Sequence, residues 1–104
     1  MDNTLDAIHH FALTVAEIAP AVHWYTSSFN CEVLLQEKTH AMLQFHNVRL
    51  SLVLPSQQPV HIAFERHDAA TLGELRLRPD GCRSTFIADP AGNPVEIVAA
   101  GENR

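Results

Sequence analysis

The sequence predicts an α+β domain built from two βαβββ modules that follow one another along the chain. Short segments of alternating apolar and polar residues indicate half-buried strands, and one stretch with a helical period indicates an amphipathic helix. The proline-bounded segment 55–59 divides the 104 residues almost in half, and the order of elements before it recurs after it. We therefore expect a single domain over residues 1–104, with module one at about 7–54 and a shortened module two at about 59–100.

The first half of the chain has the clearer pattern. Residues 8–15 alternate between apolar and polar side chains, as a strand with one buried face does. Apolar residues then recur with the spacing of one helix face, at positions 18, 21, 22, 25 and 29. Pro20 fits this helix because it stands in the first turn. Three further strand segments follow, at 31–37, 41–45 and 48–54.

The second half repeats this order in a shorter form. An alternating strand is expected at 60–65, and a short helix is expected within 67–75. Two strands are expected at 83–88 and 95–99, joined by an Asp-Pro-Ala-Gly-Asn turn. The strand that would complete the module, near 75–78, is weak in the sequence or missing.

The composition excludes several classes of protein. Seven basic residues against twelve acidic ones leave a net charge of −5, so we expect neither a nucleic acid nor a membrane as partner. No apolar run approaches the ~20 residues that span a bilayer. Residues 1–6 are acidic where a signal peptide would be basic, which predicts a cytoplasmic protein. Cys31 and Cys82 are accordingly expected to be reduced thiols.

Seven histidines are many for so short a chain, and strand alternation predicts which of them share a face. If the apolar faces of the strands pack on the helices, then His10, His61 and Glu96 all project from the opposite face of the sheet. Two imidazoles and one carboxylate are suitable ligands for a divalent metal with open coordination positions. The same alternation predicts six residues under the helix that carries Ile18, Val22 and Tyr25: Phe11, Leu13, Ile62, Phe64, Val95 and Ile97.

Simpler roles exist for each of these polar residues. A strand histidine often makes only a local hydrogen bond, and Glu96 has the option of pairing with an arginine. Arg49 and Ser51 share the predicted polar face in their own strand, where Arg49 has the simple role of a solvated charge. The remaining histidines are expected at the surface, at strand ends or in local hydrogen bonds: His9, His23, His40, His46 and His67.

Three segments of the chain carry distinctive motifs. They are the opening strand 8–15 followed by Trp24-Tyr25, the strand His-Ile-Ala-Phe-Glu at 61–65, and the closing run at 86–97 that contains Asp-Pro-Ala-Gly-Asn-Pro-Val-Glu. Their order and spacing resemble those of the vicinal oxygen chelate superfamily, which includes glyoxalases, bleomycin-resistance proteins and extradiol dioxygenases. The resemblance implies paired βαβββ modules that form a curved, cup-shaped mixed sheet with helices on the outer face.

The resemblance also implies a metal site. The superfamily's ligand positions match His10, His61 and Glu96, and the metal would be Fe, Mn, Ni, Co or Zn. Glyoxalase I and methylmalonyl-CoA epimerase add a fourth ligand, Glu or Gln, on the strand before the linker. The candidates there are Arg49 and Ser51, which do not suit a metal. This departure favours the His-His-Glu pattern of extradiol dioxygenases and fosfomycin-resistance thiol transferases, although the chain is short for this superfamily.

Three hypotheses about function remain open at this point. The first is a small metal-dependent enzyme that chelates vicinal oxygens of a small-molecule substrate, as a lyase or isomerase, a thiol transferase or a dioxygenase. The second is a metal-free protein that binds a small molecule or drug, as bleomycin-resistance proteins do. The third is a domain that acts through protein contacts. In each case we expect a homodimer, and an exchange of modules would place His10 in one chain and His61 with Glu96 in the other.

Overall fold

A computed structural model describes residues 4–101 of the chain, so residues 1–3 of the acidic N-terminal segment lie outside the described residues. The described residues form two compact units. We call residues 10–61 the N-terminal unit, and residues 4–9 together with 62–101 the C-terminal unit. No helix within the described part of the chain is long and apolar enough to cross a membrane.

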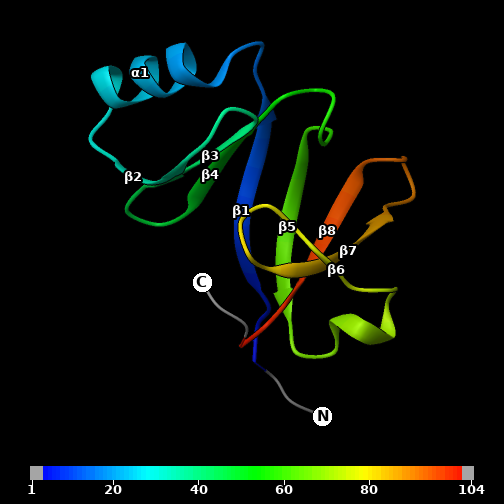
Figure 1. The fold of residues 1–104 in the computed structure, drawn as a ribbon. Helices are drawn as coiled ribbons and strands as arrows, with labels where there is room; N and C mark the ends of the chain where they lie inside the picture. Colours follow the sequence, from blue (N-terminus) through cyan, green and yellow to red (C-terminus); the bar gives the residue numbers. More distant parts are fainter. Residues whose placement is uncertain (1–3, 102–104) are drawn as a thin grey trace. The chain divides into compact units, whose positions relative to one another are not determined.

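The N-terminal unit contains one α-helix and one four-stranded sheet (Figure 1). Its elements are β1 (Ala7–Thr14, which belongs to this unit from His10 onward), α1 (Ile18–Ser28), β2 (Glu32–Gln36), β3 (His40–Gln44) and β4 (Arg49–Val53). The strand order is β2-β3-β4-β1. The β1–β4 pair is parallel, whereas β2–β3 and β3–β4 are antiparallel. The predicted order of elements in the first module is confirmed.

The C-terminal unit repeats this arrangement. Its elements are β5 (His61–Arg66, which belongs to this unit from Ile62 onward), η1 (Ala69–Thr71, a single 3-10 turn), β6 (Arg76–Leu77), β7 (Arg83–Ala88) and β8 (Pro94–Ala99). The strand order is β5-β8-β7-β6, with β5–β8 parallel and the other pairs antiparallel. Each strand therefore has its counterpart in the other unit, which confirms the α+β class and the repeat. The helix expected within 67–75 is reduced to η1, while the weak strand near 75–78 forms as β6.

The local sequence explains where α1 begins and ends. Glu17 before it and Phe29 after it both have extended backbone angles, and the Phe29 N–H donates to the Tyr25 carbonyl. Pro20 lies in the first turn, where its missing N–H costs nothing because that turn has no intrahelical acceptor. Ile18 and Val22 are buried on the inner face of the helix, as its apolar spacing predicts.

The helix packs on a different part of the sheet from the part expected. Ile18 and Val22 form a buried cluster with three sheet residues, namely Ala41, Leu43 and Leu52. Phe11 and Leu13 were expected beneath the helix, but they are 40% and 37% exposed. They lie in register with Leu50 and Leu52 and so share the apolar face. The prediction of burial was wrong because α1 packs over β2, β3 and β4 and leaves this part of β1 uncovered.

The four remaining residues of that prediction belong to the C-terminal unit. Ile97 is buried in a cluster with Ala69 and Ala99, and Phe64 and Val95 pack against this cluster, half-buried. Ile62 is also half-buried. The expectation that they pack under the helix 18–28 was wrong for Ile97, Phe64 and Val95, because these pack with Ala69 of η1, the short 3-10 turn of their own unit.

Gly73 follows η1 and passes close to β7. A Cβ atom at this position would collide with the Thr85 hydroxyl oxygen. Thr85 is 7% exposed and stands on a strand that is paired on both sides, so it has little room to move. We expect Gly73→Ala to lower the free energy of unfolding by about 1–2 kcal/mol, as overpacking does. Urea denaturation checks this, and equal stability of Gly73→Ala and wild type would contradict it.

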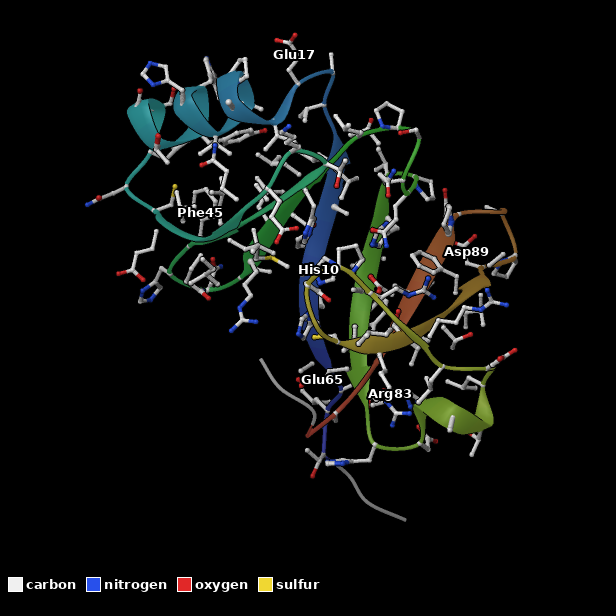
Figure 2. The ribbon with its side chains drawn as sticks, in the orientation of Figure 1. His10, Glu17, Phe45, Glu65, Arg83 and Asp89 are labelled. Carbon is white, nitrogen blue, oxygen red and sulfur yellow. The ribbon has the colours of Figure 1, made fainter. Side chains whose placement is uncertain are left out.

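The turn between β7 and β8 is organised by Asp89 (Figure 2). Its carboxylate accepts hydrogen bonds from the Asn93 side chain and from the backbone N–H groups of Asn93 and Ala91. Gly92 has a φ of +89°, a backbone conformation that suits glycine. The sequence predicted a turn here from its Asp-Pro-Ala-Gly-Asn run, and the carboxylate is what holds it closed.

These hydrogen bonds predict an acid-sensitive turn. They hold the pKa of Asp89 below its ordinary value of 3.8, chiefly through the Asn93 side chain. Because the pKa is lower in the folded protein, the stabilisation is fully present above the unfolded pKa and is lost as pH falls through the folded pKa. We expect the amide NMR signals of Ala91 and Asn93 to titrate together with a midpoint below 3.8. A midpoint at or above that value would contradict the closed turn.

Candidate metal-binding residues

Two of the three predicted ligands lie side by side in the N-terminal unit. His10 stands on β1 and His61 is the first residue of β5 (Figure 2 labels His10). Their ring centroids are 5.6 Å apart and the rings meet edge to face at 75°. Both side chains are buried, with 3% and 5% of their surface exposed. Sequence alternation placed each histidine on a face of its strand, and the structure brings the two rings together.

A backbone contact selects the tautomer of His61. Its Nδ1 lies 2.7 Å from the Pro59 carbonyl oxygen, which only accepts, so Nδ1–H is the donor. In the neutral ring Nε2 then carries the lone pair. This is the arrangement of metal-binding histidines, which commonly donate their second nitrogen to a carbonyl or carboxylate that fixes the ring. The linker proline therefore contributes its carbonyl to orienting a candidate ligand, which the sequence analysis did not foresee.

The third predicted ligand, Glu96, is buried on β8 in the C-terminal unit, with 2% of its surface exposed. Its Oε2 accepts a hydrogen bond of 2.6 Å from the Ser84 hydroxyl on β7. The same hydroxyl oxygen accepts a bond of 2.7 Å from Arg78 Nε, and Arg78 Nη2 donates to the Ser84 carbonyl at 3.1 Å. Arg78 also lies over the Phe86 ring. A chain of two hydrogen bonds thus links Arg78 through the Ser84 hydroxyl to the Glu96 carboxylate.

This network refines one of the simpler roles considered from sequence. The sequence allowed an ion pair between Glu96 and an arginine. In the structure Arg78 donates a hydrogen bond to the Ser84 hydroxyl, which in turn donates to the Glu96 carboxylate. Ser84 is fully buried, so its hydroxyl has a fixed position. A buried hydroxyl between a guanidinium and a carboxylate stabilises the ionised carboxylate, since both of its hydrogen bonds are charge-assisted.

A second buried polar pair was missed by the sequence analysis. His40 was expected at the surface or at a strand end, but it is 6% exposed, and its Nε2 lies 2.9 Å from the Ser51 hydroxyl. The strand was expected to begin at residue 41, whereas β3 begins at His40. With the correct start, alternation would have placed His40 opposite Ala41 and Leu43, which pack on the helix. Three other histidines are exposed as expected, namely His23, His46 and His67, and His9 is half-buried.

The polar face of the N-terminal unit also carries Arg49. Strand register pairs His10 with Arg49 and Ala12 with Ser51, so these four residues lie on one face of the sheet, as alternation predicted. Arg49 is half-buried, and its Nε donates to the Gln44 side-chain oxygen at 3.0 Å.

The comparisons with known proteins agree with this architecture. No protein-family model matches the sequence, and no curated protein matches it. Among solved structures, a methylmalonyl-CoA epimerase in complex with methylmalonyl-CoA and NH4+ aligns with a TM-score of 0.76 at 24% identity, over 97% of this chain and 100% of that one. The chain has the vicinal oxygen chelate fold.

Two further structures support the same fold. A variant methylmalonyl-CoA epimerase from Streptomyces coelicolor aligns with a TM-score of 0.75 at 24% identity, over 97% of this chain and all of its own. A hypothetical protein from Bacillus halodurans C-125 aligns with a TM-score of 0.74 at 16% identity, over 97% of this chain and 99% of its own. In this chain the Ser51 hydroxyl forms a hydrogen bond with the His40 ring, and Arg49 donates one to the Gln44 side chain.

Proposed function

We propose that the chain is a small metal-dependent enzyme in which His10, His61 and Glu96 hold one divalent ion. Each residue offers one ligand atom, a ring nitrogen from each histidine and an oxygen from the carboxylate. A divalent ion with three protein ligands keeps positions for two adjacent oxygens of a substrate and stabilises negative charge that develops on them. The substrate class is a small molecule with vicinal oxygens.

The observation that carries the proposal is the state of the two histidines. They are buried next to each other, and His61 is held by the Pro59 carbonyl in the tautomer that leaves Nε2 with its lone pair. The donor set suits the metals expected from sequence, since imidazole and carboxylate bind Fe, Mn, Ni, Co and Zn. In the other unit, the Ser84 hydroxyl keeps the Glu96 carboxylate oriented. Both features are the outer contacts that metal ligands usually have.

The experiment is metal analysis of protein purified without a histidine tag. We expect about one divalent ion per chain, and a chelator should remove it and lower the thermal midpoint, because an ion that binds only the folded state stabilises it. The identified metal then guides the assays for isomerase or lyase activity, thiol transfer and ring cleavage. A metal-free small-molecule binder would be favoured instead if the purified protein holds no metal and if none of the five candidate ions raises its thermal midpoint.

The homodimer stays a prediction. We expect light scattering coupled to gel filtration to give about twice the 11.5 kDa chain mass at micromolar concentration. If the modules exchange, mixing His10→Ala chains with His61→Ala chains should restore metal binding at one site per mixed dimer. Without exchange, each site retains a missing ligand in the mixture. A monomer mass would contradict the dimer before any mixing.

A further inference from the structure

Arg49 has a position that its simple role as a solvated surface charge does not explain. It is the first residue of β4, which is paired on one side with β3 and on the other with β1. Its register partner on β1 is His10, and its partner on β3 is Gln44. Side chains in register on neighbouring strands project from the same face and lie close together. Arg49 therefore occupies the strand position next to that of a candidate metal ligand, on the polar face of the N-terminal unit.

The guanidinium is held in place by a neutral group. Arg49 Nε donates to the Gln44 Oε1 at 3.0 Å, while the Gln44 side-chain nitrogen donates to the Phe45 carbonyl. The second bond fixes which end of the amide faces the arginine. The hydrogen bond from Nε thus positions the side chain. The N–H groups of the two terminal nitrogens are the other donors of the guanidinium.

No carboxylate in residues 4–101 lies within ion-pair distance of Arg49. Arg66, by comparison, forms ion pairs with both Asp68 and Asp6. The partial burial of a guanidinium cation without an anion is a cost that an anionic ligand would offset.

We propose that Arg49 binds the carboxylate of the ligand, which makes the substrate class a small carboxylate with an adjacent oxygen, such as a 2-oxo or 2-hydroxy acid. This rests on the proposed function, in which the vicinal oxygens of the ligand bind the metal next to His10. In that complex one carboxylate oxygen and the adjacent oxygen would face the metal, and the guanidinium would donate to the other carboxylate oxygen. A single guanidinium carries one positive charge, which suits a monoanionic carboxylate better than a phosphate dianion.

The test uses pyruvate and pyruvamide, two probes of nearly equal size that differ in charge. Each is titrated into Co2+-loaded protein by calorimetry, with wild type, Arg49→Gln, Arg49→Lys and Arg76→Gln. Arg76 is an exposed arginine of the C-terminal unit, so its variant controls for loss of one positive charge. We expect Arg49→Gln to weaken pyruvate binding by roughly 10- to 100-fold, the size of a lost charged hydrogen-bond pair, and to leave pyruvamide binding within about twofold. Arg49→Lys should recover part of the loss, and Arg76→Gln should match wild type.

Separate measurements distinguish this proposal from the metal proposal. Co2+ affinity is determined for every variant before the probes are added, and Arg49→Gln should keep it. If Co2+ binds and Arg49→Gln retains the preference for pyruvate, the carboxylate proposal is overturned and the metal proposal stands. If Co2+ does not bind, the same titrations are made with metal-free protein. Binding of pyruvate that depends on Arg49 then supports the anion site without the metal, and its absence overturns the anion site.

Discussion

Replacing His61 with alanine is expected to weaken Co2+ or Zn2+ binding by more than roughly 100-fold, because loss of a ligand exceeds the 10- to 100-fold effect of losing an outer contact. The same result is expected for His10→Ala and for Glu96→Ala. Competition titration against a chromogenic chelator measures the affinity. His46→Ala is the matched control, since His46 is an exposed histidine in the turn between β3 and β4 and its removal should leave the affinity unchanged.

The three variants also test the ligand set residue by residue. Each protein is first shown by circular dichroism to keep the wild-type fold. A folded Glu96→Ala protein with wild-type affinity would remove Glu96 from the set while leaving the two histidines. Wild-type affinity in the His10 and His61 variants would contradict the metal site as a whole.

Ser84→Ala should damage both stability and metal binding. The change removes the donor to Glu96 Oε2 and the acceptor of Arg78 Nε, and both partners belong to charged groups. Since Ser84 is fully buried, water does not readily replace the hydroxyl, and we expect a loss of about 3 kcal/mol in the free energy of unfolding. Metal affinity should fall by roughly 10- to 100-fold because the carboxylate loses the group that orients it.

Ser51→Ala is the matched control for this prediction. Ser51 is also a buried serine whose hydroxyl bonds to a side chain, in this case His40. Its loss should lower stability but leave metal affinity within about twofold, because its hydroxyl bonds to His40 and not to a proposed ligand. If the Ser84→Ala protein loses stability but keeps full metal affinity, the hydroxyl has a structural role and does not orient a metal ligand. The Co2+ absorption spectrum gives a second readout, since it reports ligand geometry independently of stability.

Several elements were predictable because their signals are local. Residues 18, 22 and 25 follow the helical period, and α1 forms there with Ile18 and Val22 buried. The Asp-Pro-Ala-Gly-Asn run predicts its turn because the hydrogen-bond partners of Asp89 lie within four residues of it. Alternation likewise placed His10, Arg49 and Ser51 on one sheet face, since side-chain direction in a strand depends only on position.

The sequence by itself determined the element order of each module and the face on which each strand residue lies. Only the tertiary structure decided which residues those faces meet. The exposure of Phe11 and Leu13 depends on where α1 packs, and the burial of His40 depends on where β3 begins. The Pro59 carbonyl orients His61, and the Ser84 hydroxyl orients Glu96. The hydrophobic periodicity of the sequence does not predict either contact. The physical reason is that backbone geometry repeats along the chain, whereas packing and hydrogen-bond partners are set by how separate elements meet in space.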